Sequence, residues 1–348
     1  MSMHRPSLFV ACLLAAWMVI PSMAVAADQD AKKTYPSFGK IERMDPRLDQ
    51  IIPKDAVLEK LAEGFDWSEG PVWDRKGGYL LFSDIPPNKV MKWKEGEGIT
   101  LFLQPAGYTG ATPLDVPQPG SNGLLMDPQG RLVLCQHGDR RVARLEQDGK
   151  FVTLVDRYDG KRLNSPNDGA YKSNGDLYFT DPPYGLKGRD SDPAKELPFN
   201  GVYRLAKDGT LTLLTKEMTF PNGMAFSPDE KTLYVAQSDP KRAVWMAFDV
   251  KADGTLGSGR VFADSTAATT EAGKKGLPDG MKVDQKGNVF ATGPGGVYIF
   301  APDGTQLGLI ATGEDTGNCA WGDDGSSLYI NADMYLGRVK TSTKGAGW

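Results

Sequence analysis

The sequence predicts an all-β protein that folds as a six-bladed β-propeller. A short motif recurs six times at intervals of 39 to 57 residues, which is close to one propeller blade per copy. The same succession of short apolar runs follows each copy. The run that would complete the last unit is missing near the C-terminus, whereas a suitable run stands ahead of the first unit. Together these observations indicate a ring of six similar sheets.

The recurring motif is a carboxylate or Asn followed five residues later by Asp or Ser. Its first residues are Glu69, Asn122, Asp168, Asn222, Asp279 and Asn318. After each motif a turn rich in Gly, Asp and Pro leads to a second apolar run, as at 79–83 and 232–236. A third run also recurs six times, as at 141–145 and 296–300. Short β-branched and aromatic runs between such turns are typical of hairpin strands.

The fourth run occurs only five times. Its copies lie at 99–103, 151–155, 211–215, 259–263 and 307–311, and none follows residues 337–341. Residues 56–62 precede the first unit, and a strand there would pair into the last blade. Such pairing closes the ring and removes an exposed sheet edge. We therefore assign residues 56–348 to a six-bladed propeller catalytic domain and residues 28–55 to an N-terminal extension. A pair of β-sandwiches would not explain six copies of one unit.

Residues 1–27 have the pattern of a secretory signal peptide. Arg5 precedes an apolar run over 8–20, and small residues at Ala24 and Ala26 suit a cleavage site. Thirteen apolar residues at ~1.5 Å each are too short to cross a bilayer core. We expect a cleaved signal and a periplasmic or secreted protein. A lipid anchor on Cys12 is disfavoured, because Cys12 lies inside the apolar run.

Composition excludes several classes of protein. The net charge is −4, whereas binding to a phosphate backbone requires a basic surface, so we expect no nucleic-acid partner. We also expect no membrane association after signal cleavage. Only Cys135 and Cys319 follow the signal, which is too few for a disulfide scaffold, so an apolar core must hold the fold. The sequence does not define an oligomeric state.

Topology places the repeated polar residues at one mouth of the propeller. The first strand of each blade lines the central channel, so the residue ahead of it stands at that mouth. The long segments 105–120, 181–200, 238–241 and 265–277 fall at the same end, where functional loops are expected. Glu69 precedes an apolar Val72-Trp73 pair, and burial of its charge would require a partner.

Four oxygen donors are therefore expected to converge on one axis: Glu69, Asn167, Asn222 and Asp279. Two carboxylates and two amide oxygens form a hard set that favours one divalent cation, Ca²⁺ first, with Mg²⁺, Mn²⁺ or Zn²⁺ as alternatives. Taken singly, the Asn and Asp residues that precede Gly in these segments are also typical of turns, because both types tolerate a positive φ.

His137 is the only histidine after the signal, which excludes a His-rich zinc cluster. No G-x-S-x-G motif is present, and a serine triad would have to use this one histidine. His137 lies in a loop expected at the mouth, where it either contacts substrate or relays a proton, or is a surface histidine that only bonds the neighbouring Asp139. Arg140 and Tyr184, in two of the mouth loops, are candidate substrate contacts.

Four ordered motifs identify a family resemblance: 68–71 (SEGP), 165–169 (SPNDG), 220–225 (FPNGMA) and 277–281 (LPDGM). With them, residues from about 61 to 330 resemble the SMP-30/gluconolactonase/LRE-like family of six-bladed propellers, and 135–141 and 181–186 look like its bacterial gluconolactonase-type branch. The resemblance implies metal-dependent hydrolysis of a small-molecule sugar lactone. It also implies a cation held by Glu69, Asn222 and Asp279, Asn167 as a further ligand or substrate contact, and Asp279 as a base.

One departure affects the expected substrate. Animal-type members of this family place an Arg where this chain has Ser165, so a lactone in general is better supported than gluconolactone itself. Two other functions stay open: a metal-dependent phosphotriesterase-like hydrolase, and a non-catalytic Ca²⁺-dependent binding propeller.

Overall fold

The computed structural model describes residues 1–3 and 34–348. Cys12 and all but the first three residues of the expected signal peptide lie outside the described residues. Residues 35–348 form one compact unit. In the described part of the chain, no helix is both long and apolar enough to cross a membrane.

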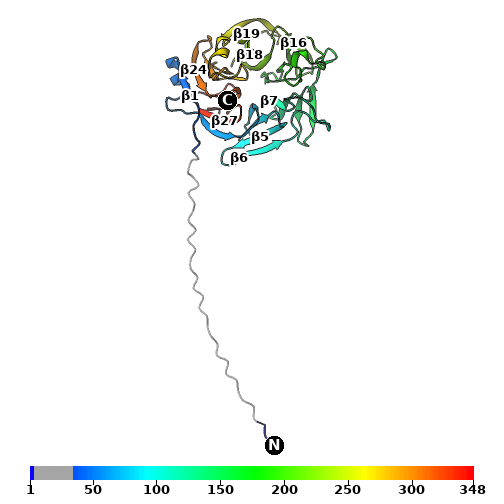
Figure 1. Ribbon diagram of the computed structural model, residues 1–348, viewed down its shortest axis with the longest axis vertical. Coiled ribbons are helices and arrows are strands. Elements are labelled where there is room, and N and C mark those ends of the chain that lie inside the picture. The colour runs from blue at the N-terminus through cyan, green and yellow to red at the C-terminus, as the bar shows by residue number, and fades with distance from the viewer. Residues whose placement is uncertain (4–33) are drawn as a thin grey trace. The chain divides into compact units, whose positions relative to one another are not determined.

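The compact unit is an all-β six-bladed propeller, as the repeats predict. Antiparallel sheets follow one another around the ring in chain order, so that strands β5, β7, β16, β19 and β24 are met in succession (Figure 1). The first strands of neighbouring blades contact one another all the way round. These six first strands therefore surround the central channel.

The first three blades have four strands each. Blade one contains β3 (Ser68–Asp74), β4 (Tyr79–Asp84), β5 (Lys89–Lys94) and β6 (Gly98–Leu103). Blade two contains β7 (Ser121–Met126), β8 (Leu132–Gln136), β9 (Arg141–Leu145) and β10 (Phe151–Val155). Blade three contains β13 (Gly169–Tyr171), β14 (Leu177–Asp181), β15 (Gly201–Leu205) and β16 (Leu211–Thr215). A small hairpin, β11 (Arg157–Tyr158) and β12 (Lys161–Arg162), links blades two and three.

Blade four has the same four-strand order, whereas blades five and six each gain an N-terminal strand at the outer edge. Blade four contains β17 (Pro221–Phe226), β18 (Thr232–Asp239), β19 (Arg242–Val250) and β20 (Leu256–Asp264). Blade five contains β21 (Met281–Val283), β22 (Val289–Gly293), β23 (Gly296–Phe300), β24 (Gln306–Ala311) and β1 (Lys40–Arg43). Blade six contains β25 (Thr316–Gly322), β26 (Ser327–Ala332), β27 (Tyr335–Lys340) and β2 (Glu59–Glu63). Three short 3-10 helices are η1 (Pro46–Gln50), η2 (Arg189–Ser191) and η3 (Ala267–Thr270).

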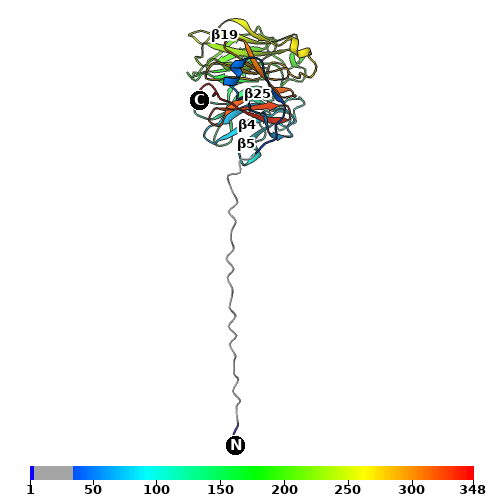
Figure 2. The ribbon, with the colours of Figure 1, turned by 90° about the vertical axis from the view of Figure 1, so that its left-hand side faces the viewer.

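Strand β2 closes the ring, as expected from the missing fourth run. It pairs antiparallel with β27, with Glu59 opposite Arg338. The Arg338 guanidinium donates to the carboxylates of Glu59 and Glu95, each at 2.7 Å, and so links blade six to blade one. Strand β25 of blade six contacts β3 of blade one directly, and Figure 2 shows these two blades beside one another, labelled at β25 and at β4 and β5. Strand β2 is thus the outermost strand of blade six and covers the edge of β27.

Strand β1 adds a fifth strand to blade five, which the repeat pattern does not predict. Lys40 pairs with Ala311 at one end of β1 and Arg43 with Gly308 at the other. Helix η1 follows, and its Leu48 is fully buried against blade five. Part of the segment expected as an extension over 28–55 therefore belongs to the propeller, whose compact unit begins at Tyr35.

The core lies between blades as well as within them. Trp73 of blade one stacks on Tyr329 of blade six, with ring centroids 5.4 Å apart. Tyr178 of blade three meets Phe226 of blade four edge-on at 4.9 Å. Each large ring buries roughly 150–250 Å² of surface, so neighbouring sheets hold one another in place. This rigid ring fixes the positions of the loops at its mouths.

Residues 341–348 bind blades other than the one they leave. The Ala346 amide donates to the Val283 carbonyl in blade five at 2.9 Å. The Arg75 guanidinium of blade one lies over the Trp348 ring, 3.9 Å from its centroid. This C-terminal tail therefore connects blades five, six and one.

Candidate functional site

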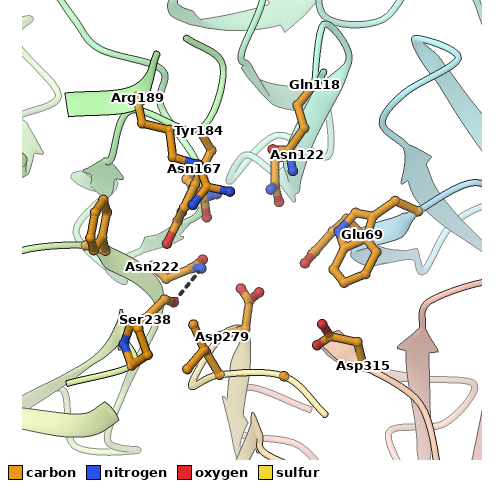
Figure 3. A pocket seen from close by; sticks show the side chains of 15 residues that line it. Glu69, Gln118, Asn122, Asn167, Tyr184, Arg189, Asn222, Ser238, Asp279 and Asp315 are labelled. Carbon is orange, nitrogen blue, oxygen red and sulfur yellow. Dashed lines mark hydrogen bonds between the residues drawn. The ribbon is translucent and has the colours of Figure 1, made fainter. Parts of the chain in front are cut away.

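A polar cavity of about 360 Å³ opens at one mouth of the channel (Figure 3). Glu69, Asn122 and Asn222 each lie second in a first strand, in β3, β7 and β17. Asn167 and Asp279 lie two residues ahead of β13 and β21. The start of each of these five first strands thus delivers one polar side chain to the same space.

The four predicted oxygen donors come together in this cavity. Figure 3 shows the side chains of Glu69, Asn167, Asn222 and Asp279 converging from different blades. Glu69 and Asn167 are each 1 % exposed and Asn222 is 3 % exposed. Each of the four long segments expected at the mouth also contributes lining residues: Gln118, Tyr184, Arg189, Ser238, Pro240, Gly276 and Leu277.

Ser238 fixes the orientation of the Asn222 amide. The Ser238 hydroxyl donates its one proton to the Pro278 carbonyl. Its oxygen must then accept from the Asn222 Nδ2 group, at 2.9 Å. The nitrogen end of the amide therefore faces Ser238, and Oδ1 is the end left for the cavity. Oδ1 is buried and has no hydrogen-bond partner among the described residues.

Asn167 is held by its main chain on both sides. Its amide donates to the Thr180 carbonyl of β14 at 2.9 Å, and its carbonyl accepts from the Gly123 amide of β7 at 2.7 Å. Its Oδ1 is also buried and has no hydrogen-bond partner among the described residues. Buried polar atoms are nearly always partnered, so two orphaned amide oxygens at one cavity indicate a missing ligand.

Burial and mutual repulsion raise the pKa values of the carboxyl groups in the cavity. Burial raises the pKa of Glu69 to about 8, although a hydrogen bond from the Gly70 amide at 2.8 Å opposes the shift. Burial and then the charges of Glu69 and Asp315 raise the pKa of Asp279 well above its ordinary value. Like charges in a desolvated site disfavour ionisation. A cation among these groups would remove that penalty.

These residues fit a divalent cation with hard oxygen ligands. Within the described residues, no group of three or more His, Cys, Asp or Glu side chains could hold a metal ion. A cation here would therefore depend on the amide oxygens of Asn167 and Asn222 beside the carboxylates of Glu69 and Asp279. Mixed carboxylate and amide ligation is common for Ca²⁺ and suits Zn²⁺ less well.

The glycines of the motifs do not serve as turn residues. Of Gly70, Gly123, Gly169, Gly223 and Gly280, only Gly70 has a positive φ, at 51°. A Cβ at Gly223 would instead overlap the Asp279 backbone of the next blade. The reading of these segments as ordinary turns is therefore wrong, because glycine is needed where neighbouring first strands approach closely.

Close approach also makes room for the carboxylates. A Cβ at Gly317 would overlap the Glu69 carboxylate, and one at Gly276 would overlap that of Asp315. Both positions face an acidic side chain of the cavity. Larger residues there would push those side chains away.

His137 does not line this cavity. Its side chain is 0 % exposed, and neither ring nitrogen has a hydrogen-bond partner in the described part of the chain. Burial lowers the pKa of His137 to about 3, so the ring is neutral near pH 7. It makes no hydrogen bond to Asp139, whose carboxylate instead accepts from Arg141 and Thr109. The structure thus supports neither of the two expectations for His137, a mouth contact or a surface loop.

Arg140 also lies away from the cavity, whereas Tyr184 lines it. The Arg140 guanidinium donates to the carbonyls of Leu163, Asn164 and Ala194, and it holds loops together beneath the surface. Tyr184 stacks on Phe220 with ring centroids 6.0 Å apart. Burial raises the pKa of its hydroxyl, so Tyr184 stays protonated at neutral pH.

Several cavity residues were not predicted from the sequence. They are Trp67, Gln118, Asn122, Arg189, Phe220, Ser238 and Asp315. Asn122 begins one of the six motifs, and this repeat position was the available signal. Trp67 and Phe220 each stand two residues ahead of a motif's first residue, as Leu277 does, so this position was a second available signal. The other four lie in loops or at strand ends, where periodicity carries no information.

The first residues of the third and sixth motifs lie near Glu69 but do not line the cavity. Asp168 and Asn318 are buried, and Asn318 Nδ2 donates to Asp168 Oδ2 at 3.2 Å. They satisfy one another, which separates them from Asn167 and Asn222.

Comparison with known proteins supports the resemblance noted in the sequence. The family model described as the SMP-30/Gluconolactonase/LRE-like region matches residues 67–333. A curated gluconolactonase from Zymomonas mobilis is 41 % identical over 346 residues, which is 96 % of this chain and 97 % of that protein. A diisopropyl-fluorophosphatase from Loligo vulgaris is 24 % identical over 72 % of this chain and 80 % of that protein. Among solved structures, a gluconolactonase from Xanthomonas campestris is 34 % identical with a TM-score of 0.75, covering 89 % of this chain and 99 % of that one.

Proposed function

This chain belongs to the SMP-30/gluconolactonase/LRE-like family, and from that membership we propose that it hydrolyses a sugar lactone to the free acid at the cavity described above. It is a hydrolase of the gluconolactonase type. The observation that carries the proposal is the convergence of Glu69, Asn167, Asn222 and Asp279 at a single cavity. The cavity has room beside these four side chains for an ester carbonyl and an attacking water.

The proposal includes one divalent cation, with Ca²⁺ first and Mg²⁺, Mn²⁺ or Zn²⁺ as alternatives. Glu69, Asn167, Asn222 and Asp279 would hold it, because they supply two charges and two orphaned amide oxygens. When bound, such a cation polarises a carbonyl and lowers the pKa of water.

The chain's own residues would position the lactone and accept a proton from the attacking water. Water adds to the lactone carbonyl carbon, the ring C–O bond breaks, and a proton passes from the water to the departing ring oxygen. Asp279 accepts that proton in the simplest scheme. Asp315 is a second candidate, because it lines the cavity and is outside the four-oxygen set. We assign substrate contact to Asn167 and Tyr184, which line the cavity, and not to His137 or Arg140, which do not line it.

Removal of metal tests the proposal directly. Exhaustive chelation should abolish acid release from a panel of aldonolactones, and Ca²⁺, Mg²⁺, Mn²⁺ or Zn²⁺ should restore it. Continuous titration of released acid, with elemental analysis of each sample, makes the measurement. Full activity in protein shown to be free of metal would exclude a catalytic role for the four oxygen donors.

A second candidate is phosphotriester or phosphofluoridate hydrolysis. It is favoured by the similarity to the Loligo vulgaris diisopropyl-fluorophosphatase. The same cavity could polarise a phosphoryl oxygen in place of a carbonyl. Release of fluoride from diisopropyl fluorophosphate, compared with lactone hydrolysis under the same conditions, separates the two. A protein that binds Ca²⁺ and turns over neither substrate class would be a binding propeller.

We further propose that the protein is exported and that residues 1–27 are removed. The support is the charge, length and small-residue pattern of that segment. Intact mass of material recovered from outside the cytoplasm should correspond to a chain beginning at Ala27 or Asp28. A lipid adduct on Cys12 would contradict this proposal.

A further inference from the structure

One charged group of the cavity has no role in the chemistry proposed above. Arg189, the first residue of η2, is the one basic side chain among the residues that line the cavity. Figure 3 shows its side chain extending past Tyr184 toward Asn167 and the cavity. Its guanidinium lies 5.5 Å from the centroid of the Tyr184 ring, which stacks in turn on Phe220. The aromatic pair therefore supports the guanidinium from one side.

The main chain presents Arg189 in a fixed direction. Its φ is 48°, a left-handed conformation that is uncommon for a residue with a side chain. The loop around it is internally bonded, since the Gly188 amide donates to the Asp192 carboxylate at 2.7 Å. The Arg189 amide donates to the Leu186 carbonyl at 3.1 Å. An unusual conformation held in this way at a cavity points to a functional constraint.

The Arg189 guanidinium has its donors free for a ligand. Within the described residues no carboxylate pairs with it, although Glu69, Asp279 and Asp315 all line the same cavity. A guanidinium offers five N–H donors in a planar fork. Figure 3 places Asp315 across the cavity from Arg189, so a donor and an acceptor face the space between them.

A guanidinium can bind either an anionic substituent or hydroxyl groups, and the charge of the cavity favours one of these over the other. The formal charges of the three carboxylates balance those of Arg189 and one divalent cation, so the loaded cavity offers no net attraction to an anionic substituent. Hydroxyl groups, in contrast, both accept from a guanidinium and donate to a carboxylate. We propose that Arg189 determines specificity by binding the hydroxyl groups of an uncharged polyhydroxylated lactone. This inference rests on the proposed lactonase function.

Paired substrates test the inference in the metal-loaded protein. Glucono-δ-lactone carries hydroxyl groups and δ-valerolactone carries none, although both have the same six-membered ester ring. Arg189→Met keeps the aliphatic stem and removes the donors. It should lower kcat/KM for glucono-δ-lactone by about 10- to 100-fold, mainly through KM, and change that for δ-valerolactone by less than about 2-fold. Arg189→Lys should recover part of the loss.

Arg260→Met is the matched control. Arg260 is an exposed arginine on β20 that pairs with Asp249, away from the cavity, so its replacement should leave both substrates unaffected. Equal losses on both lactones would overturn the inference by placing Arg189 at the reacting atoms, and unchanged kinetics would overturn it outright. A wild-type preference for 6-phosphogluconolactone that Arg189→Met removes would replace hydroxyl recognition with anion recognition. A wild-type protein inactive on all three lactones would contradict the proposed function itself.

Discussion

The hydrogen bond from Asn222 to Ser238 decides which end of the Asn222 amide meets the cavity. Ser238 accepts from Asn222 and donates to the carbonyl of Pro278, the residue before Asp279. One hydroxyl therefore couples two proposed ligands from blades four and five. Partners of this kind orient ligands without touching the ion.

Ser238→Ala should weaken cation binding by about 10- to 100-fold, because the Asn222 amide would lose its fixed orientation. Isothermal titration with Ca²⁺ makes the measurement. Ser265→Ala is the matched control, since Ser265 is also buried and also donates to a carbonyl, that of Ala243, but does not line the cavity. Equal affinities in wild type and Ser238→Ala would show that Ser238 does not position Asn222.

Replacement of the acidic donors should separate cation chemistry from histidine chemistry. Glu69→Gln and Asp279→Asn each remove a charge from the ligand set and should lower kcat/KM for a lactone by at least ~10²-fold. His137→Ala removes a buried neutral ring outside the cavity, so it should lower Tm and change kcat/KM by less than about 10-fold. Kinetics at saturating metal, with metal content measured, provide the test. An inactive His137→Ala that remains folded and metal-loaded would reverse the assignment.

At the scale of elements, the features that repeat could be predicted and those that occur once could not. The first strands recur, so the alignment of Glu69, Asn222 and Asp279 placed them at one mouth. Arg189 and Asp315 reach the same cavity from loops of unequal length, whose paths have no period. Loop geometry also buried His137, which loop position alone had suggested would be accessible. Strand β1 is short, largely polar and outside every repeat, so no sequence pattern predicted its pairing with β24.

Removal of β1 and β2 should destabilise the whole ring. A chain beginning at Gly64 lacks the outer strand of blade six and the added strand of blade five, and it exposes two sheet edges. Its Tm should fall well below that of a chain beginning at Tyr35, which keeps both strands and serves as the control. Circular dichroism during heating makes the comparison. Coincident melting curves would mean that closure by β2 contributes nothing to stability.

At the scale of the whole molecule, the cavity couples stability to cation and to pH. The pKa of Glu69 is raised to about 8 by burial, whereas an unfolded chain restores its ordinary value near 4.5. The folded state therefore binds more protons than the unfolded state between these values, and stability falls as pH rises through that window. His137 acts in the opposite sense, because its lowered pKa costs stability only as pH falls below its ordinary value near 6.5.

The metal-free protein should therefore lose Tm as pH rises from about 6.5 to 8.5, because the opposing contribution of His137 ends within about one pH unit above 6.5, once the unfolded histidine is also neutral. Asp181, whose pKa burial raises to about 7, contributes to the same trend. Glu69→Gln removes one contribution and should flatten the slope, and saturating Ca²⁺ should raise Tm most at the high-pH end. Scanning calorimetry of both proteins with and without Ca²⁺ measures these slopes. Parallel curves for wild type and Glu69→Gln would show that Glu69 is not the buried acid responsible.

Closure of the ring by β2 and β27 also sets the order of events during synthesis. Glu59 and its partner Arg338 are 279 residues apart, so this contact forms only after nearly the whole chain has left the ribosome. Until then β2 lacks its partner strand β27 and has only the local bridge from Ser37 to Glu59, and the loop-closure entropy of the ring stays uncompensated. A translation product that stops before β27 therefore lacks the strand pairing that closes the ring. We expect such products to be more open to aggregation and proteolysis than the finished chain, because the edge that β27 would cover stays exposed.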